Sequence, residues 1–170
     1  MRAARVMLAA SVVGLIGAAI LFTRKAAAAE NMSDYETLFK KWAAIYQTDW
    51  RLLMAHALAE SNLDSAAVNK SDPSYGLMQV LCQHKGTGIC TNVFNVDGWA
   101  GMTAGRLMDP DTNIRIGAQI IAYNVRTFGM PRAVAVYNAW DQRKAPQAGP
   151  FKNQSYVNKV LANYARLQGR

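Results

Sequence analysis

The feature that most constrains the fold of this 170-residue chain is an apolar repeat with three- and four-residue spacing. Side chains at that spacing lie on one face of an α-helix, and such faces are buried when helices pack together. The repeat is clearest between Asp109 and Gly129, where the apolar residues are Ile114, Ala118, Ile121, Val125 and Phe128. Similar spacing predicts further helices over residues 33–47, 50–62, 102–108, 131–140 and around 157–167.

Three segments interrupt the helical pattern. Residues 69–76 combine Asn, Lys, Ser, Asp, Pro and Gly, which predicts a turn-rich loop or a small hairpin. Residues 82–99 have no helical repeat and predict an irregular loop, and residues 142–150 are a loop rich in Pro and Gly. Since no internal repeat or linker is visible, we expect a single, mainly α domain.

Residues 1–29 are expected to direct export and to lie outside the fold. Residues 6–23 are uncharged and have basic residues on both sides, and Ala27-Ala28-Ala29 resembles a signal cleavage site. This run of 18 residues is just long enough to span a bilayer, so an uncleaved signal-anchor is the alternative. In both cases residues 30–170 would be the exported, periplasmic domain, either released or tethered to the inner membrane by residues 6–23.

Composition and charge narrow the class of protein. The chain is 51% apolar and 18% charged, which excludes a disordered chain, and it lacks the composition of collagens and coiled coils. The net charge is +8, but four basic and no acidic residues precede residue 30, which leaves +4. The remaining basic residues are scattered, so we expect no nucleic-acid partner; a membrane surface or an acidic polymer remains.

Cys82 and Cys90 lie eight positions apart in the part expected to be exported. Two such cysteines usually pair in an oxidising compartment, so we expect a disulfide that ties this loop. Two free thiols in a reducing cell are the alternative. A zinc site would need two further ligands, which His84 alone does not supply, so no metal site is expected.

Glu60 is the residue that the pattern singles out for catalysis. It continues the helix face that carries Leu53 and Ala57, so its carboxyl group is expected to be partly desolvated. Desolvation raises the pKa of a carboxyl group, and an acid that stays protonated near neutral pH can cleave a glycosidic bond. An exposed Glu60, or one paired with Arg51, is the alternative. His56, one turn earlier, is expected to be a buried neutral histidine rather than a metal ligand or charge relay.

Five short motifs together resemble a known family. In chain order they are Glu60-Ser61-Asn62, Tyr75-Gly76-Leu77-Met78-Gln79-Val80, Asn113-Ile114 with Gly117, Ala133-Val134-Ala135-Val136-Tyr137-Asn138, and Tyr156-Val157 with Val160. Over about residues 35–167 the chain resembles the lytic transglycosylase domain of the soluble-lytic-transglycosylase and VirB1-like type. The resemblance implies a lysozyme-like α+β fold, mainly helical, that acts on the glycan strands of peptidoglycan without a metal or cofactor.

The resemblance also implies roles for individual residues. Glu60 would be the single catalytic acid and base, and Met78 and Gln79 would line the sugar groove. Tyr137 matches the family tyrosine that lies against the catalytic glutamate, and Tyr156 matches a second aromatic residue near it.

Two departures bear on the substrate and the chemistry. Trp140 replaces the usual Gly after the Tyr-Asn-Ala motif, which predicts a rebuilt loop and an altered groove. Animal-type lysozymes share a similar Tyr-Gly-x-x-Gln turn with Asp before the Tyr, and the matching residue here is Ser74, which we expect to bind substrate. With one carboxyl group, the economical route is intramolecular and yields a 1,6-anhydro ring on N-acetylmuramic acid.

Three alternatives for function and setting stay open. Asp72, two residues before Ser74, would be the second carboxylate of a hydrolytic muramidase. A non-catalytic wall-binding or secretion-scaffold module is the alternative from another class. The partners beyond peptidoglycan would be a secretion or conjugation machine, or a phage apparatus for lysis or infection.

Overall fold

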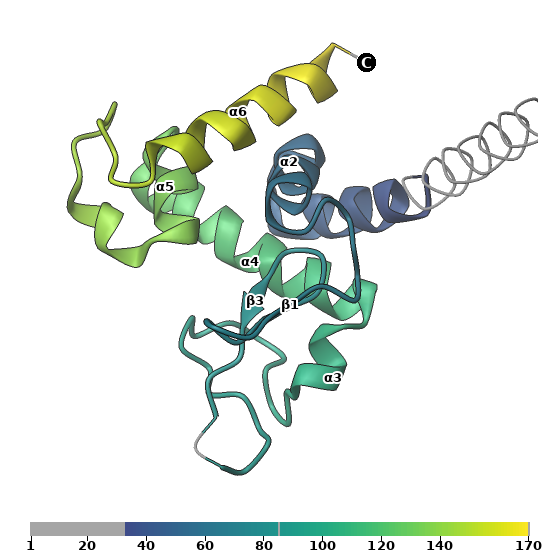
Figure 1. The fold of residues 1–170 in the computed structure, drawn as a ribbon. Coiled ribbons are helices and arrows are strands. Elements are labelled where there is room, and N and C mark those ends of the chain that lie inside the picture. The colour runs from purple at the N-terminus through teal and green to yellow at the C-terminus, as the bar shows by residue number, and fades with distance from the viewer. Residues whose placement is uncertain (1–32, 85, 170) are drawn as a thin grey trace, which may run out of the picture. The chain divides into compact units, whose positions relative to one another are not determined.

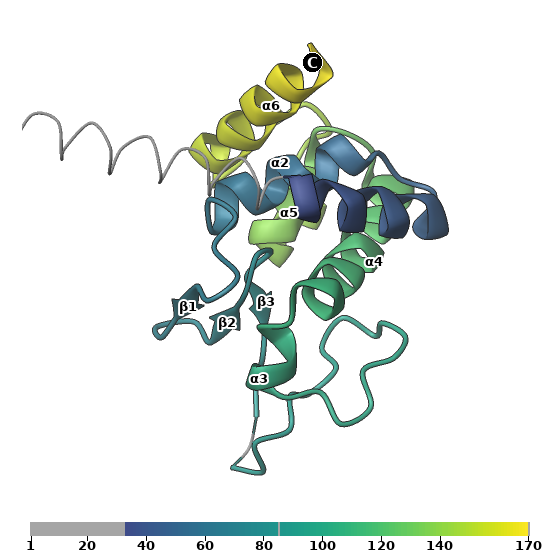
Figure 2. The ribbon, with the colours of Figure 1, turned by 90° about the vertical axis from the view of Figure 1, so that its right-hand side faces the viewer.

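The computed structural model describes residues 33–84 and 86–169, and most of them are helical (Figures 1 and 2). A first helix covers the described residues 33–46. The other helical elements are α2 (Trp50–Glu60), α3 (Ala104–Leu107), α4 (Pro110–Phe128), α5 (Arg132–Asn138), the 3-10 helix η1 (Trp140–Lys144) and α6 (Gln154–Gln168). The prediction of a mainly α fold is confirmed.

The export segment expected at residues 1–29 lies outside the described residues. The chain from Glu36 onward forms one unit, to which everything below refers. Within the described ranges, no helix combines the length and the apolar character that crossing a membrane requires.

Helix α4 forms where the apolar repeat predicts it. The Asp109 side chain caps its start by accepting a hydrogen bond from the main-chain N–H of Thr112 at 2.9 Å, and Pro110 occupies the first turn. Gly129 ends the helix with φ of +66°, a conformation that glycine adopts without strain. Ile114 and Ala118 are fully buried, so the predicted apolar face of α4 is part of the core.

Helices α2 and α6 pack against each other (Figure 2), and hydrogen bonds at their two ends show that they run antiparallel. At one end, the Tyr164 hydroxyl of α6 donates to Asp49, the residue that caps α2, at 2.8 Å. At the other end, the Lys159 ammonium donates to the main-chain carbonyl of Ala59 at 2.6 Å. This pairing brings the beginning of α6 next to the end of α2.

The hairpin predicted at residues 69–76 belongs to a small antiparallel sheet with the order β1-β2-β3. The strands are β1 (Val68–Asn69), β2 (Ser74–Tyr75) and β3 (Val80–Leu81). Gly76, with φ of +75°, turns the chain after β2, and a side chain there would collide with the carbonyl of Leu107 and the amide of Asn113. The turn therefore requires glycine both for its backbone conformation and for the close approach of α4.

The region after α5 differs from the prediction. The helix expected over residues 131–140 ends at Asn138, and Trp140 begins the 3-10 helix η1, which also covers the start of the loop expected at 142–150. Ala139 is extended, with φ of −142°, and separates the two helices. The spacing from Tyr137 to Trp140 is helical, but Trp140 is 53% exposed, so core packing does not extend the helix through it.

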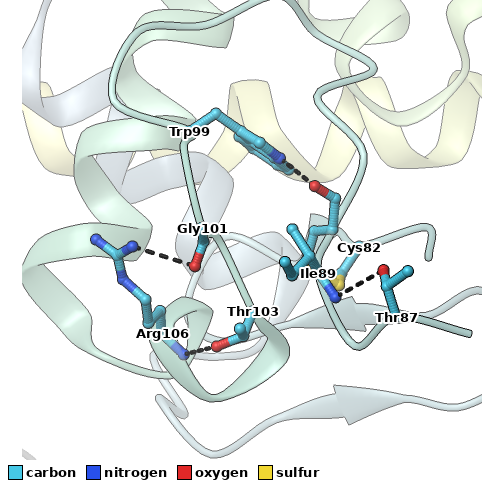
Figure 3. Close-up of a disulfide and its surroundings, with 8 residues drawn as sticks. Cys82, Thr87, Ile89, Trp99, Gly101, Thr103 and Arg106 are labelled. Atoms are coloured by element: carbon cyan, nitrogen blue, oxygen red, sulfur yellow. Dashed lines mark hydrogen bonds between the residues drawn. A yellow bond between two sulfur atoms is a disulfide. The ribbon is translucent and has the colours of Figure 1, made fainter.

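The predicted Cys82–Cys90 disulfide is present, and it ties the irregular loop that follows β3 (Figure 3). The indole N–H of Trp99 donates to the carbonyl of Cys90 at 2.7 Å, and Trp99 is buried. Ile89 forms an isolated β-bridge with Thr103, at the start of α3. The loop lacks regular structure, as expected; the Trp99 hydrogen bond ties it internally, and the Ile89 bridge ties it to the start of α3.

Candidate active site

Glu60 is the last residue of α2 and lies where the helix turns toward the sheet. The Ser61 hydroxyl, next in the chain, donates to the carbonyl of Leu77 at 2.7 Å and so ties the helix end to the segment between β2 and β3. Asn62 and Leu63 follow with φ of +56° and +65°, which ends the helix sharply. The site therefore rests on a fixed turn.

Glu60 opens onto a groove of about 970 Å³. The groove extends from the helix end along the sheet and past α4 to η1. Its lining includes Asp72, Ser74, Gln79, Tyr123, Tyr137 and Trp140. A groove of this volume can hold a ligand of several rings.

A line of hydrogen bonds connects Glu60 with the interior. The Tyr156 hydroxyl of α6 donates to Oε1 of Glu60 at 2.7 Å. Nδ1 of His56, one turn before Glu60 on α2, lies 2.9 Å from the same hydroxyl oxygen. His56 is only 1% exposed, so the expected buried histidine is confirmed.

Burial shifts the protonation of these groups. It raises the pKa of Glu60 to about 7, although the hydrogen bond from Tyr156 and the charge of Lys159 oppose this effect. Burial also lowers the pKa of His56 to about 3, so the imidazole is neutral at physiological pH. The pKa values of Tyr137 and Tyr156 are raised by burial and by the nearby Glu60, so both keep their hydroxyl hydrogens.

Tyr137 lies close to these groups, on α5. Its ring centroid is 4.7 Å from that of His56, and its hydroxyl donates to the carbonyl of Met78 at 2.8 Å. Tyr137 also lines the groove. The structure thus brings together Glu60, Tyr137 and Tyr156, which are far apart in the sequence.

Met78 differs from the expectation that it lines the groove. Its side chain is 0% exposed and packs where a side chain at Gly117 would otherwise be, so it belongs to the core. Its contribution to the site is the main-chain carbonyl that Tyr137 binds. A motif match identifies the position of Met78 in the chain but not the direction of its side chain, which packs against α4 at Gly117.

Gln79 and Ser74 both line the groove. The Gln79 amide donates to the carbonyls of Gly76 and Ala67 at 2.9 and 3.2 Å, which holds a backbone with φ of +46° at this position. Ser74 is only 6% exposed, so little of it is accessible from the groove. Asp72 also lines the groove and is exposed, in the turn between β1 and β2.

Asn113 supports the site from below, at the start of α4. Its carbonyl oxygen accepts from the main-chain N–H of Met78 at 2.7 Å, and its amide donates to the carbonyls of Tyr75 and Leu107 at 2.8 and 2.7 Å. The side chain is fully buried. One residue thus holds the turn that carries Met78 and Gln79 against α4.

Lys159 is a site residue that the sequence analysis missed. Its charge lowers the pKa of Glu60, and its ammonium is held at the neighbouring carbonyl of Ala59. The available signal was its position three residues after Tyr156, on the same face of a helix. Across residues 33–84 and 86–169, no cluster of three His, Cys, Asp or Glu side chains has the arrangement of a metal site.

Comparison with known proteins identifies the family to which a chain with this site belongs. Residues 37–159 match the family model of the transglycosylase SLT domain. The chain belongs to this family. The match covers α2, the sheet, α4, α5 and the first residues of α6, and therefore every residue of the hydrogen-bonded line at Glu60.

The similar proteins are much longer, and this chain matches a part of each. The soluble lytic murein transglycosylases of Escherichia coli K12 and O157:H7 are each 33% identical over 147 residues, which cover 75% of this chain and 22% of the relative. The crystal structure of the 70-kDa soluble lytic transglycosylase from Escherichia coli has a TM-score of 0.59 at 28% identity, over 79% of this chain and 24% of that chain. Its complex with bulgecin A gives 0.60. The chain therefore spans about a quarter of the length of these relatives, and its fold is lysozyme-like.

Proposed function

We propose that this SLT domain is a peptidoglycan lytic transglycosylase in which Glu60 cleaves the β-1,4 bond between N-acetylmuramic acid and N-acetylglucosamine. The observation that carries the proposal is a groove carboxyl group whose pKa is about 7. Near neutral pH both of its protonation states are populated, so the same group can donate a hydrogen and later accept one. The name of the Escherichia coli relatives supports the same assignment.

The proposed reaction uses a single carboxyl group. Glu60 donates its hydrogen to the glycosidic oxygen, the bond from this oxygen to the muramyl anomeric carbon breaks, and the 2-acetamido group of the substrate shares the positive charge. Ionised Glu60 then takes the hydrogen of the C6 hydroxyl of the same muramyl unit, while the C6 oxygen bonds to the anomeric carbon. A 1,6-anhydro end is formed, Glu60 is protonated again, and no water is consumed.

Asp72 lies before β2, whereas Glu60 adjoins the segment after β2, and this separation favours the route with one carboxyl group over a muramidase. A second catalytic carboxylate has to lie within roughly 5–10 Å of the acid, so that the two groups flank the bond that is cleaved. Asp72 is exposed in the turn beyond the last β1–β2 pair, Asn69 and Ser74. Glu60, in contrast, is next to Ser61, whose hydroxyl binds Leu77 beyond the other end of β2.

Exposed aromatic residues make the groove suitable for a glycan. Tyr123 is 51% exposed and Trp140 is 53% exposed, and each packs against Phe128 with rings nearly perpendicular. The Arg143 guanidinium lies over the Trp140 ring, 5.1 Å from its centroid. The ring faces that neither Arg143 nor Phe128 covers can stack on the apolar faces of sugar rings. Arg126, which also lines the groove, would attract the carboxylates of peptidoglycan stem peptides.

The proposal includes export by residues 1–29 and a periplasmic location for the domain of residues 30–170. The Cys82–Cys90 disulfide supports it, since disulfides persist in oxidising compartments. The proposed setting is local opening of the wall for a secretion or conjugation machine, or for a phage.

Digestion of purified sacculi with product analysis by mass spectrometry tests the proposal. The wild type and the Asp72→Asn variant should release 1,6-anhydromuropeptides, whereas Glu60→Gln should release none. Glu36→Gln, which makes the same chemical change at a site 36% exposed, is the matched control and should be active. Products heavier by one water, lost in Asp72→Asn, would establish the muramidase instead. Wild-type binding to sacculi with no released product would establish the non-catalytic module.

A further inference from the structure

The line of hydrogen bonds behind Glu60 has a direction that the chemistry of its members determines. A tyrosine hydroxyl carries one hydrogen, and an ionised carboxylate can only accept. When Glu60 is ionised, the Tyr156 hydrogen must therefore point to Oε1, at 2.7 Å. Tyr156 then has only acceptor capacity left for His56, at 2.9 Å, so His56 must be the donor.

This direction also specifies the tautomer of His56. Because the imidazole is buried and neutral, only one of its two ring nitrogens carries a hydrogen. The nitrogen that faces Tyr156 is Nδ1. His56 is thus expected to be the Nδ1–H tautomer, with Nε2 unprotonated.

When Glu60 takes up a proton, two arrangements are available. With the proton on Oε2, the hydrogens of Tyr156 and His56 stay where they are. With the proton on Oε1, this oxygen becomes a hydroxyl, which is a weaker acceptor for the Tyr156 hydrogen. If the new proton instead points at Tyr156, the Tyr156 hydrogen has to turn to His56, and the imidazole hydrogen has to move to Nε2 inside the protein. Both forms of the second arrangement weaken or reverse the hydrogen bond from Tyr156, so the first arrangement is favoured.

We propose that His56, acting through Tyr156, is a positioning residue that keeps the acidic hydrogen of Glu60 on Oε2. This oxygen receives no hydrogen bond from any described residue, and Glu60 lines the groove, so Oε2 is the atom available to a substrate oxygen. The significance of this hydrogen for catalysis rests on the proposed function; the tautomer and the hydrogen-bond direction do not.

The surrounding groups leave this role to His56 and Tyr156. The Tyr137 hydroxyl is engaged with the carbonyl of Met78, although its ring lies against His56. The Lys159 ammonium, from α6, is engaged with the carbonyl of Ala59 and acts on Glu60 through its charge. Neither replaces the hydrogen bond that Tyr156 gives to Oε1.

The first test leaves the line intact and needs no substrate. Nitrogen NMR on full-length protein labelled with 15N-histidine, carrying His84→Gln so that His56 is the one remaining histidine, reports the tautomer directly. The expected result is a neutral ring with hydrogen on Nδ1 at pH values on both sides of the Glu60 titration. A ring protonated at Nε2, or a tautomer that changes as Glu60 titrates, would overturn the proposal.

The second test separates positioning from a structural role. The pKa of Glu60 is measured from its carboxyl 13C signal, assigned with Glu60→Gln, in wild type, Tyr156→Phe, His56→Leu and the double variant. Loss of the Tyr156 hydrogen bond should raise the Glu60 pKa by about one unit. His56→Leu should raise it by less, because Tyr156 can then also turn away, and should add nothing in the Tyr156→Phe background. An unchanged pKa in His56→Leu, or additive shifts, would contradict the coupling.

If the wild type releases products from sacculi, the third test compares the pH profiles of kcat/KM and kcat between the wild type and the two single variants. The basic limb of the kcat/KM profile should move upward with the Glu60 pKa in both single variants. The plateau of kcat should fall about twofold, because either carboxyl oxygen can then hold the acidic hydrogen. An unchanged kcat plateau in both variants would overturn the catalytic part of the proposal. An inactive wild type with the expected tautomer and pKa shifts would instead contradict the proposed function while leaving the hydrogen-bond direction in place.

Discussion

Glu60 should destabilise the folded protein at neutral and alkaline pH, and Glu60→Gln should remove this effect. Burial moves the pKa of the carboxyl group from 4.5 to about 7, so folding opposes its ionisation. The folded state then binds more protons than the unfolded state between these two values, and stability falls as pH rises through this window. Each pKa unit corresponds to about 1.4 kcal/mol, so ionised Glu60 is about 3 kcal/mol less stable in the folded protein than in the unfolded chain.

Glutamine has nearly the same shape, carries no charge, and can still accept the hydrogen bond from Tyr156. The stability gained by Glu60→Gln should therefore be small at pH 4.5, grow through pH 7, and reach roughly 3 kcal/mol at pH 8. Urea unfolding of both proteins at a series of pH values measures this difference, and other titrating groups cancel in the comparison. Glu36→Gln, at the surface pair with Lys40, should change stability by less than about 1 kcal/mol at every pH. A difference between wild type and Glu60→Gln that did not grow with pH would refute the burial of this carboxyl group.

Three further perturbations test other parts of the structure. Asn113→Ala leaves two buried carbonyls and an N–H without their partner. It should lower the unfolding free energy by about 3 kcal/mol and the midpoint of thermal unfolding by roughly 10 °C. A change below about 1 kcal/mol would be inconsistent with the three hydrogen bonds. Trp140→Ala should raise KM for glycan strands roughly 5–10-fold with kcat within about twofold, while Trp140→Phe, which keeps an aromatic face, should stay near the wild type; equal KM values would remove Trp140 from the groove's binding surface. Reduction of the Cys82–Cys90 disulfide should destabilise the protein by about 2–3 kcal/mol in urea unfolding, and Cys82→Ala/Cys90→Ala should be insensitive to reductant.

The helices were predictable because burial of one face leaves a direct trace in the sequence. The repeat from Ile114 to Phe128, with a cap at Asp109 and glycine at 129, defines α4 to within a residue at each end. Trp140 shows where this reasoning fails. Its spacing is helical, but its ring lies nearly perpendicular to that of Phe128 and lines the groove, so apolar character at the right interval did not mean burial in the core.

The candidate site was predictable in its central residue and not in its geometry. Glu60 continues a buried face, and that pattern alone indicates a raised pKa. The contact between Tyr156 and His56 depends on the antiparallel pairing of α2 with α6, over a separation of 100 residues, and nothing local in the sequence specifies it. Met78 shows the converse, since its motif position was recognised but the direction of its side chain is determined by packing against Gly117.

The same burial that makes Glu60 usable as an acid is a stability problem that the surrounding fold must offset. A more exposed carboxyl group would ionise well below neutral pH and would have no hydrogen to donate at pH 7. A carboxyl group buried without Tyr156 and Lys159 would have a higher pKa, so it would rarely be ionised and able to accept a hydrogen in the second step. The hydrogen bond and the charge from α6 both lower a pKa that burial raises, which leaves it at about 7. Because both groups come from α6, the pairing of α2 with α6 determines whether one carboxyl group can serve in both steps. Weakening that pairing far from the site, for example at the hydrogen bond from Tyr164 to Asp49, should therefore shift the Glu60 pKa as well as stability.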